Sequence, residues 1–192
     1  MVNVPKNFPL LKTERLVLRK FSTEDADDVK RLASAPEIAE NTFIPYPYED
    51  GMAEDWIKNQ HLCYISDLLI NFAITLAVDD SLIGSAGLTF DQRNRCAQLG
   101  FWVGVSYWGN GYCTEACEEV LKYAFEVLGL KKIDAFHFSG NTASGRVLQK
   151  IGMKYIGTRS KHYFHRGRYR DSEMYYLEYS DYFEHTQVSD HR

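Results

Sequence analysis

The chain has 192 residues, of which 45% are hydrophobic and 25% are charged, and its formal net charge is −4. This composition is typical of a folded globular protein and excludes a chain that is disordered throughout. No apolar run reaches the roughly 18–20 residues that a membrane helix needs, and the net negative charge argues against a broad nucleic-acid-binding face.

The N-terminal residues lack the apolar segment of a secretory signal, so we expect a cytoplasmic protein. Its four cysteines should then be reduced thiols, and their spacing matches no zinc signature. Cys113 and Cys117 are four residues apart on an expected helix and are interpreted as small packing residues.

The first half of the chain predicts a strand, two helices and a group of three strands. Alternating apolar residues predict the strands at 15–21, 71–78, 82–90 and 96–105. Helices are expected at 22–34, capped by Ser22 or Thr23, and at 49–65. A short turn joins the second and third strands into an antiparallel hairpin. The apolar residues expected to share one face of the strand at 96–105 are Leu99, Phe101, Val103 and Val105.

The second half alternates helices and strands. Apolar residues recur at helical spacing over 112–128, and Gly129 is expected to end that helix. A shorter helix at 141–152 has Asn141 as its cap and Gly152 as its stop. Further strands are predicted at 132–138, 153–164 and 168–183. The sequence therefore predicts one α/β (α+β) domain over residues 1–192, with a mixed sheet and a core from about 10 to 183.

The stretch "YWGNGYCTEA" at 107–116 lies between a predicted strand and a predicted helix. The first N–H groups of a helix have no partner inside it, and the helix N-terminus carries partial positive charge. Gly109 and Gly111 lack Cβ atoms that would keep a phosphate away and permit positive φ angles. This turn therefore suits a phosphate group.

Two common phosphate-binding motifs do not fit this turn. It has no Gly-Lys-Ser/Thr triplet, which the P-loop requires. The dinucleotide fingerprint requires a third glycine where Thr114 stands, and the three preceding strands are expected to be antiparallel. A tight turn that merely needs glycine is the structural alternative.

Four stretches of the chain resemble, in order, the RimJ/RimL-like branch of the GNAT superfamily of N-acetyltransferases. They are "TERLVLRKFSTEDA", "YWGNGYCTEA", "NTASGRVLQKIGMKYIGT" and "GRYRDSEMYYL". The resemblance covers about residues 10–180. It implies the GNAT acyl-CoA N-acyltransferase fold, with the strands at 96–105 and 132–138 splayed apart. It also implies acetyl-CoA as donor and an amine as acceptor.

The resemblance also implies where the donor lies. The pyrophosphate is expected on the backbone of Trp108, Gly109, Asn110, Gly111, Tyr112, Cys113 and Thr114. The pantetheine is expected to pair with the backbone of Phe101 and Val103. Asn141 and Ser144 are expected to flank the thioester, and the Ser144 hydroxyl is the candidate hydrogen-bond donor to the sulfur.

Two positions depart from the family pattern. Gln98 stands where many GNAT enzymes have a glutamate as general base, and Leu148 stands where many have a tyrosine as acid. A neutral amide cannot accept the proton, so the base stays unassigned. His137, one of the tyrosines Tyr155, Tyr163 and Tyr169, and a water chain are the alternatives.

Other polar residues have weaker functional interpretations. His162 and His165 lack an evident third partner for a metal, so no metal is predicted. Five Lys and Arg residues over 159–170 indicate a solvated hairpin end, or else a surface for an anionic acceptor or RNA. Lys131 and Lys132 are candidates for contact with the CoA ribose phosphate.

The resemblance favours an acetyl-CoA-dependent N-acetyltransferase. Its acceptor would be a protein N-terminal α-amine, such as that of a ribosomal protein, or a small amine. The alternative is a CoA-binding regulatory or interaction module without catalysis, which Gln98 and Leu148 favour and Asn141 and Ser144 oppose. A homodimer is a candidate assembly, with the aromatic residues of the last strand as the candidate contact.

Overall fold

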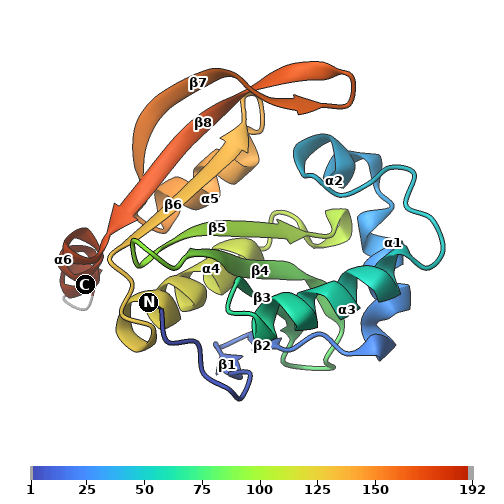
Figure 1. The fold of residues 1–192 in the computed structure, drawn as a ribbon, viewed down its shortest axis with the longest axis horizontal. Coiled ribbons are helices and arrows are strands. Elements are labelled where there is room, and N and C mark those ends of the chain that lie inside the picture. The colour runs from blue at the N-terminus through green and yellow to red at the C-terminus, as the bar shows by residue number, and fades with distance from the viewer. Residues whose placement is uncertain (1, 190–192) are drawn as a thin grey trace.

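The protein is described by a computed structural model that covers residues 2–189. Eight strands form one sheet in the order β1-β2-β3-β4-β5-β6-β8-β7 (Figure 1). Neighbouring strands pair in antiparallel fashion except for β5 and β6, which are parallel. The predicted fold class, a mixed sheet flanked by helices, is confirmed.

The strands are β1 (Leu11–Lys12), β2 (Leu16–Arg19), β3 (Leu69–Leu76), β4 (Leu82–Asp91), β5 (Cys96–Val103), β6 (Lys132–Phe138), β7 (Lys154–His165) and β8 (Arg168–Glu178). The α-helices are α1 (Ala26–Ala33), α2 (Pro36–Asn41), α3 (Met52–Ile65), α4 (Tyr112–Lys122), α5 (Thr142–Lys150) and α6 (Tyr179–Ser189). Short helical turns are η1 (Thr23–Asp25), η2 (Val105–Tyr107) and η3 (Tyr123–Val127).

Besides the two-residue strand β1, which was not predicted, three segments differ from the sequence prediction. Helix α2 was not predicted, because six residues opened by a proline are too few to show a helical period. Residues 179–183 were predicted as strand but begin helix α6, in which Tyr182 stacks on Phe125 with ring centroids 4.9 Å apart. Val105 does not share the strand face of Leu99, because β5 ends at Val103.

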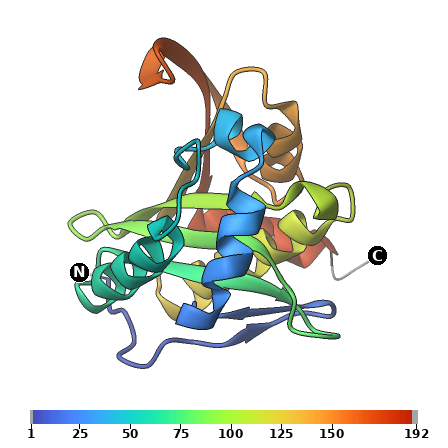
Figure 2. The same cartoon turned by 90° about the vertical axis from the view of Figure 1, so that its right-hand side faces the viewer.

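Helices cover both faces of the sheet (Figure 2). Alternate residues of β3 point to opposite faces. Phe72 belongs to the main core with α4, whereas Ala73 packs in a second cluster with α1 and α3. Cys117 of α4 is fully buried in the main core, and all four cysteines are free thiols.

Strands β5 and β6 separate soon after they begin, which opens the sheet. Their pairing runs only from Cys96↔Lys132 to Gln98↔Asp134. Beyond this point β5 continues to Val103 beside β4, and β6 continues to Phe138 beside β8 (Figure 1). The expected splay between these two strands is therefore present.

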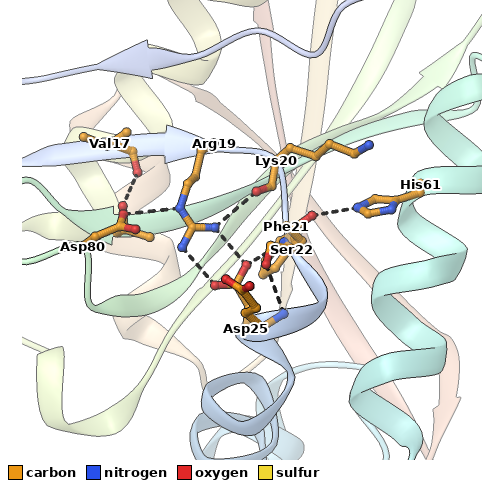
Figure 3. Close-up of polar contacts among 10 residues, drawn as sticks. Val17, Arg19, Lys20, Phe21, Ser22, Asp25, His61 and Asp80 are labelled. Carbon is orange, nitrogen blue, oxygen red and sulfur yellow. Dashed lines mark hydrogen bonds and ion pairs between the residues drawn. The ribbon is translucent and has the colours of Figure 1, made fainter.

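A partly buried ion pair joins β2 to the helical turn η1, which leads directly into α1 (Figure 3). The Arg19 guanidinium donates to both oxygens of Asp25 at 2.8 and 2.9 Å, and its Nε lies 3.3 Å from Asp80. The side chain of Asp25 is only 8% exposed. Asp25 also accepts from the backbone N–H of Ser22, which completes the predicted cap at the start of this helical segment. This brace fixes α1, which forms part of a cavity described below.

The long β7–β8 hairpin reaches toward α2 and is tied to it (Figure 1). Arg168 and Arg170 form ion pairs with Glu40, while Arg166 donates to the carbonyl oxygens of Ala39 and Ile44. Three cations of the 159–170 segment therefore hold α2 and the following loop in place.

Candidate active site

Two cavities meet beside the open ends of β5 and β6. The larger cavity, of about 590 Å³, lies among α1, α3, the loop at 42–48 and strands β3 to β6. The smaller cavity, of about 500 Å³, lies among the end of β5, the glycine turn, α4 and α5. The residues that line both are Asn41, Thr42, Phe101, Trp102, Asn141 and Ser144.

The glycine turn forms one wall of the smaller cavity. Gly109 and Gly111 have φ angles of +80° and +81°, which L side chains rarely adopt, so the turn requires glycine at both positions. The first backbone bond of α4 runs from Glu115 N–H to the Gly111 carbonyl. The N–H groups of Tyr112, Cys113 and Thr114 therefore lack partners within the helix. This arrangement suits an anion.

Asn110 differs from its neighbours in the turn because it does not line the smaller cavity. Trp108, Gly109, Gly111, Tyr112, Cys113 and Thr114 all line the smaller cavity, but Asn110 does not. Its side-chain amide instead donates to the carbonyl oxygens of Tyr107 and Trp108, at 3.2 and 3.1 Å. The Asn110 side chain therefore stabilises the turn through hydrogen bonds to the backbone within it.

The N-terminal segment braces this turn through Arg15. Its guanidinium donates to the Asn110 carbonyl at 3.0 Å, lies 4.7 Å from the ring centre of Tyr112 and pairs with Glu115 at 2.6 Å. Glu115 also accepts from the Thr13 hydroxyl. Burial raises the pKa of Glu115, but hydrogen bonds from Thr13 and Arg15 outweigh it and leave this pKa below its usual value. The brace places a cation beside the turn, and sequence reasoning missed it.

The open edge of β5 carries free backbone groups. Gly104 N–H donates to the Ile83 carbonyl on β4. Because hydrogen-bonded residues alternate along an antiparallel pair, the backbone groups of Phe101 and Val103 face away from β4, toward the opening. The indole N–H of Trp108 donates to the Val103 carbonyl at 2.6 Å. Trp108 thus engages one of the groups expected to pair with pantetheine.

Asn141 and Ser144 bond to each other at the start of α5. The Ser144 backbone N–H donates to the side-chain oxygen of Asn141 at 3.2 Å, which confirms the predicted helix cap. The Asn141 amide donates in turn to the Ser144 hydroxyl oxygen at 2.9 Å. Because that oxygen accepts, the hydroxyl hydrogen of Ser144 is free to donate elsewhere.

The two positions that depart from the family pattern lie in different surroundings. Gln98 is exposed on β5 and lines the larger cavity. Leu148 is fully buried in the main core and lines neither cavity. The titratable side chains among the described residues of the larger cavity are Tyr48, Asp55 and His137.

His137 lies against the start of α5. Its Nδ1 is 2.9 Å from the Phe138 carbonyl oxygen. Since a carbonyl only accepts, Nδ1 must carry the hydrogen, and Nε2 of the neutral ring is an acceptor. A Cβ at Gly145 would lie 2.8 Å from this Nε2, so Gly145 leaves room for the imidazole. On β8, Glu173 is the strand-pairing partner of His137, and the Tyr175 ring lies 5.6 Å from the imidazole.

Cations other than those expected line the smaller cavity. Arg146 and Lys150, four residues apart on α5, form part of its wall. Neither Lys131 nor Lys132 lines either of these two cavities, and Lys132 pairs with Asp134 at 2.9 Å. Within residues 2–189, no group of three or more His, Cys, Asp and Glu side chains is arranged to hold a metal ion. In the same part of the chain, no helix is long and apolar enough to cross a membrane.

Comparisons with known proteins all indicate one family, the GNAT acetyltransferases. Residues 15–154 match the acetyltransferase (GNAT) domain. The chain is 32% identical over 169 residues to the uncharacterized N-acetyltransferase p20 of Bacillus licheniformis, covering 87% of this chain and 94% of the relative. It is 29% identical over 173 residues to the putative ribosomal N-acetyltransferase YdaF of Bacillus subtilis, covering 85% and 91%.

A solved structure shows the same fold. RimL, a ribosomal α-N-protein acetyltransferase in complex with coenzyme A, superposes with a TM-score of 0.79 at 14% identity. The match covers 88% of this chain and 98% of RimL.

Proposed function

Because the chain belongs to the GNAT acetyltransferase family and acetyl-CoA is its cosubstrate, we propose that it acetylates a primary amine by direct attack in a ternary complex. The observation that carries this proposal is the meeting of the two cavities at Phe101 and Ser144. Donor and acceptor held in adjoining cavities react as if within one molecule, which lowers the entropic part of the barrier. Residues from about 10 to 183 are proposed to act as one catalytic domain, because a single sheet supplies walls to both cavities.

The smaller cavity is proposed to hold the CoA part of the donor. The turn from Trp108 to Thr114 offers backbone N–H groups to the pyrophosphate, and Arg146 and Lys150 add positive charge on the same wall. The backbone N–H and C=O of Phe101 and the N–H of Val103 are left to pair with the pantetheine.

The chemistry is proposed to centre on the junction of the two cavities. Bound acetyl-CoA supplies an activated thioester, so that a C–N bond forms as the C–S bond breaks, the amine loses a proton and the sulfur gains one. Of the Phe101 and Val103 N–H groups, the one that the pantetheine does not engage donates to the carbonyl oxygen as it gains negative charge. The Ser144 hydroxyl, oriented by Asn141, donates to the departing sulfur.

His137 is the proposed proton acceptor. Of the three titratable side chains that line the larger cavity, it alone lies on the strand that leads directly into Asn141 and Ser144. Its Nε2, the ring nitrogen that can accept a proton, lies beside Gly145 at the start of α5, the helix that also carries Ser144. A water chain through the larger cavity is the second route.

Family membership favours catalysis over the non-catalytic alternative, and the identity of the acceptor is a proposal. A protein or peptide N-terminal α-amine is supported by the names of YdaF and RimL, which refer to ribosomal acetylation. A small amine is also compatible with a cavity of about 590 Å³, since small-ligand pockets span about 300–1,000 Å³.

The test is initial-velocity kinetics by thiol release, with acetyl-CoA varied against amines of several classes. Direct attack predicts that the double-reciprocal lines intersect, whereas parallel lines would indicate a covalent acetyl-enzyme. An absence of thiol release with every amine, while calorimetry shows CoA bound, would contradict the proposed catalysis.

A further inference from the structure

The larger cavity, which the proposed function assigns to the acceptor, carries almost no charge. Among the described residues that line it, Asp55 is the one carboxylate, and there is no Lys or Arg. Asp55 is exposed on α3. Because an unpaired charge is costly to bury, this cavity suits an acceptor with one cation and no anion. A polyamine brings several cations, for which these walls offer too few partners.

One wall of this cavity is aromatic. Phe43, on the loop that follows α2, lies 5.4 Å from the ring of Phe138 and 6.3 Å from that of Phe136. All three line the cavity, yet Phe43 is still 57% exposed. Arg166 holds this loop in place through the Ile44 carbonyl. When an apolar group of a ligand covers an exposed aromatic ring on a fixed loop, the burial of apolar surface favours binding.

Two polar residues that line this cavity, Asn71 and Ser85, are already paired. The Ser85 hydroxyl donates to the Asn71 side-chain oxygen at 2.7 Å, and the Asn71 amide donates to Gln60 at 3.2 Å. The buried side-chain polar atoms that lack a partner in the described chain lie on Tyr123, His162 and Ser172, none of which lines this cavity. A site selects strongly for a polar ligand when it would otherwise leave a buried polar group unpaired, and the groups already buried in this cavity set no such demand.

We infer that the acceptor is a primary amine attached to a bulky aromatic or branched apolar group, with no second cation and no carboxylate. This inference rests on the proposed acyl transfer. The same chemistry has two sources, a peptide that begins with a large apolar residue and a small aromatic amine. The cavity is large enough for either.

The experiment compares matched acceptors on the full chain. Thiol release gives kcat/KM for Phe-Gly-Gly-amide, Ser-Gly-Gly-amide, Asp-Gly-Gly-amide, phenethylamine and spermidine. Calorimetry gives the affinity of each for the protein saturated with CoA. The phenylalanine peptide or phenethylamine is expected to exceed the serine peptide by at least about tenfold, because an apolar contact in a pocket gives about 10- to 200-fold discrimination. Whichever of the two leads identifies the source.

The outcomes separate this inference from the proposed function. Turnover that favours spermidine or the aspartate peptide would refute the inference but support the proposed acetyltransferase activity. Selective binding of the aromatic amines without turnover would support the inference and refute catalysis by this chain. A kcat/KM for the serine peptide that equals or exceeds those of both the phenylalanine peptide and phenethylamine, or no binding of either aromatic amine, would overturn the inference.

A pair of variants assigns the preference to the aromatic wall. Phe43→Ala is expected to reduce the preference for phenylalanine over serine about tenfold or more. Phe164→Ala is the matched control, because Phe164 is 65% exposed on β7 and lines neither cavity. A preference that Phe43→Ala leaves unchanged, or that both variants reduce equally, would remove Phe43 from acceptor recognition.

Discussion

Replacing Ser144 with alanine tests the chemistry at the junction of the two cavities. The Ser144 hydroxyl accepts from Asn141, so its hydrogen is available for the sulfur that departs with negative charge. A hydrogen bond to a charged group contributes about 1.5–3 kcal/mol, and about 1.36 kcal/mol is a factor of ten in rate. Ser144→Ala should therefore lower the single-turnover rate about 10- to 160-fold.

The same substitution should leave the fold and the binding of CoA nearly intact. The cap of α5 uses the backbone N–H of Ser144, which alanine retains. We expect the free energy of unfolding in urea to change by less than about 1 kcal/mol. The CoA dissociation constant should change by less than about threefold, which is under about 0.7 kcal/mol.

The assay is thiol release in a single turnover with acetyl-CoA bound, which separates chemistry from product release. Ser144→Thr keeps a hydroxyl and should restore most of the rate. Ser160→Ala is the control, because the Ser160 hydroxyl bonds to Asp171 on the hairpin and lies outside both cavities. An unchanged rate in Ser144→Ala, or a loss of CoA affinity as large as the loss of rate, would refute the reasoning.

Three further predictions concern the glycine turn and two ion pairs. Gly111→Trp should abolish measurable CoA binding, because the indole would fill the space proposed for the pyrophosphate. Gly111→Ala shares the strain of about 1–2 kcal/mol at positive φ but should bind CoA more tightly than Gly111→Trp. Equal affinities of the two variants in calorimetry would contradict the placement of CoA on this turn. Asp25→Ala removes two hydrogen bonds of Arg19 and the capping bond from Ser22, and should lower the free energy of unfolding by about 2–4 kcal/mol. Asp28→Ala, at an exposed pair, should lower it by about 1 kcal/mol or less, and similar urea midpoints for the two variants would disprove the brace. The pKa of Glu115 is lowered in the folded state, so the native chain should have a higher free energy of unfolding than Glu115→Gln above about pH 4.3. This difference should vanish as the pH falls through the folded pKa. A difference in the free energy of unfolding that widens toward low pH would contradict the prediction.

Much of the fold was predictable because its elements carry a clear hydrophobic period. The β2 to β5 strands and α4 show the expected spacing of apolar residues, and the glycine turn carries its own local signature. Helix α6 was missed for a physical reason. Tyr175, Leu177 and Tyr179 alternate as in a strand, and only Tyr182 and Phe183 show the i, i+3 and i+4 spacing of a helix.

The site was less predictable where it depends on contacts between distant segments. Thr13 and Glu115 are 102 residues apart in the chain, so no local pattern reveals the brace on the glycine turn. Arg146 and Lys150 share one helix face at i, i+4 spacing, a signal that was present but did not tell which way that face points. The positions of Phe43 and His137 beside one cavity follow from the hairpin contacts and the splayed strands, which the sequence alone does not place.

The central claim is that CoA lies in the opening between β5 and β6 and on the glycine turn. Hydrogen exchange followed by mass spectrometry, with and without CoA, tests it most directly. The account predicts slower exchange at residues 101–103, 109–114 and the start of α5, and no change in the hairpin at 159–170. Protection confined to other segments, or none at 109–114 while CoA is bound, would contradict it.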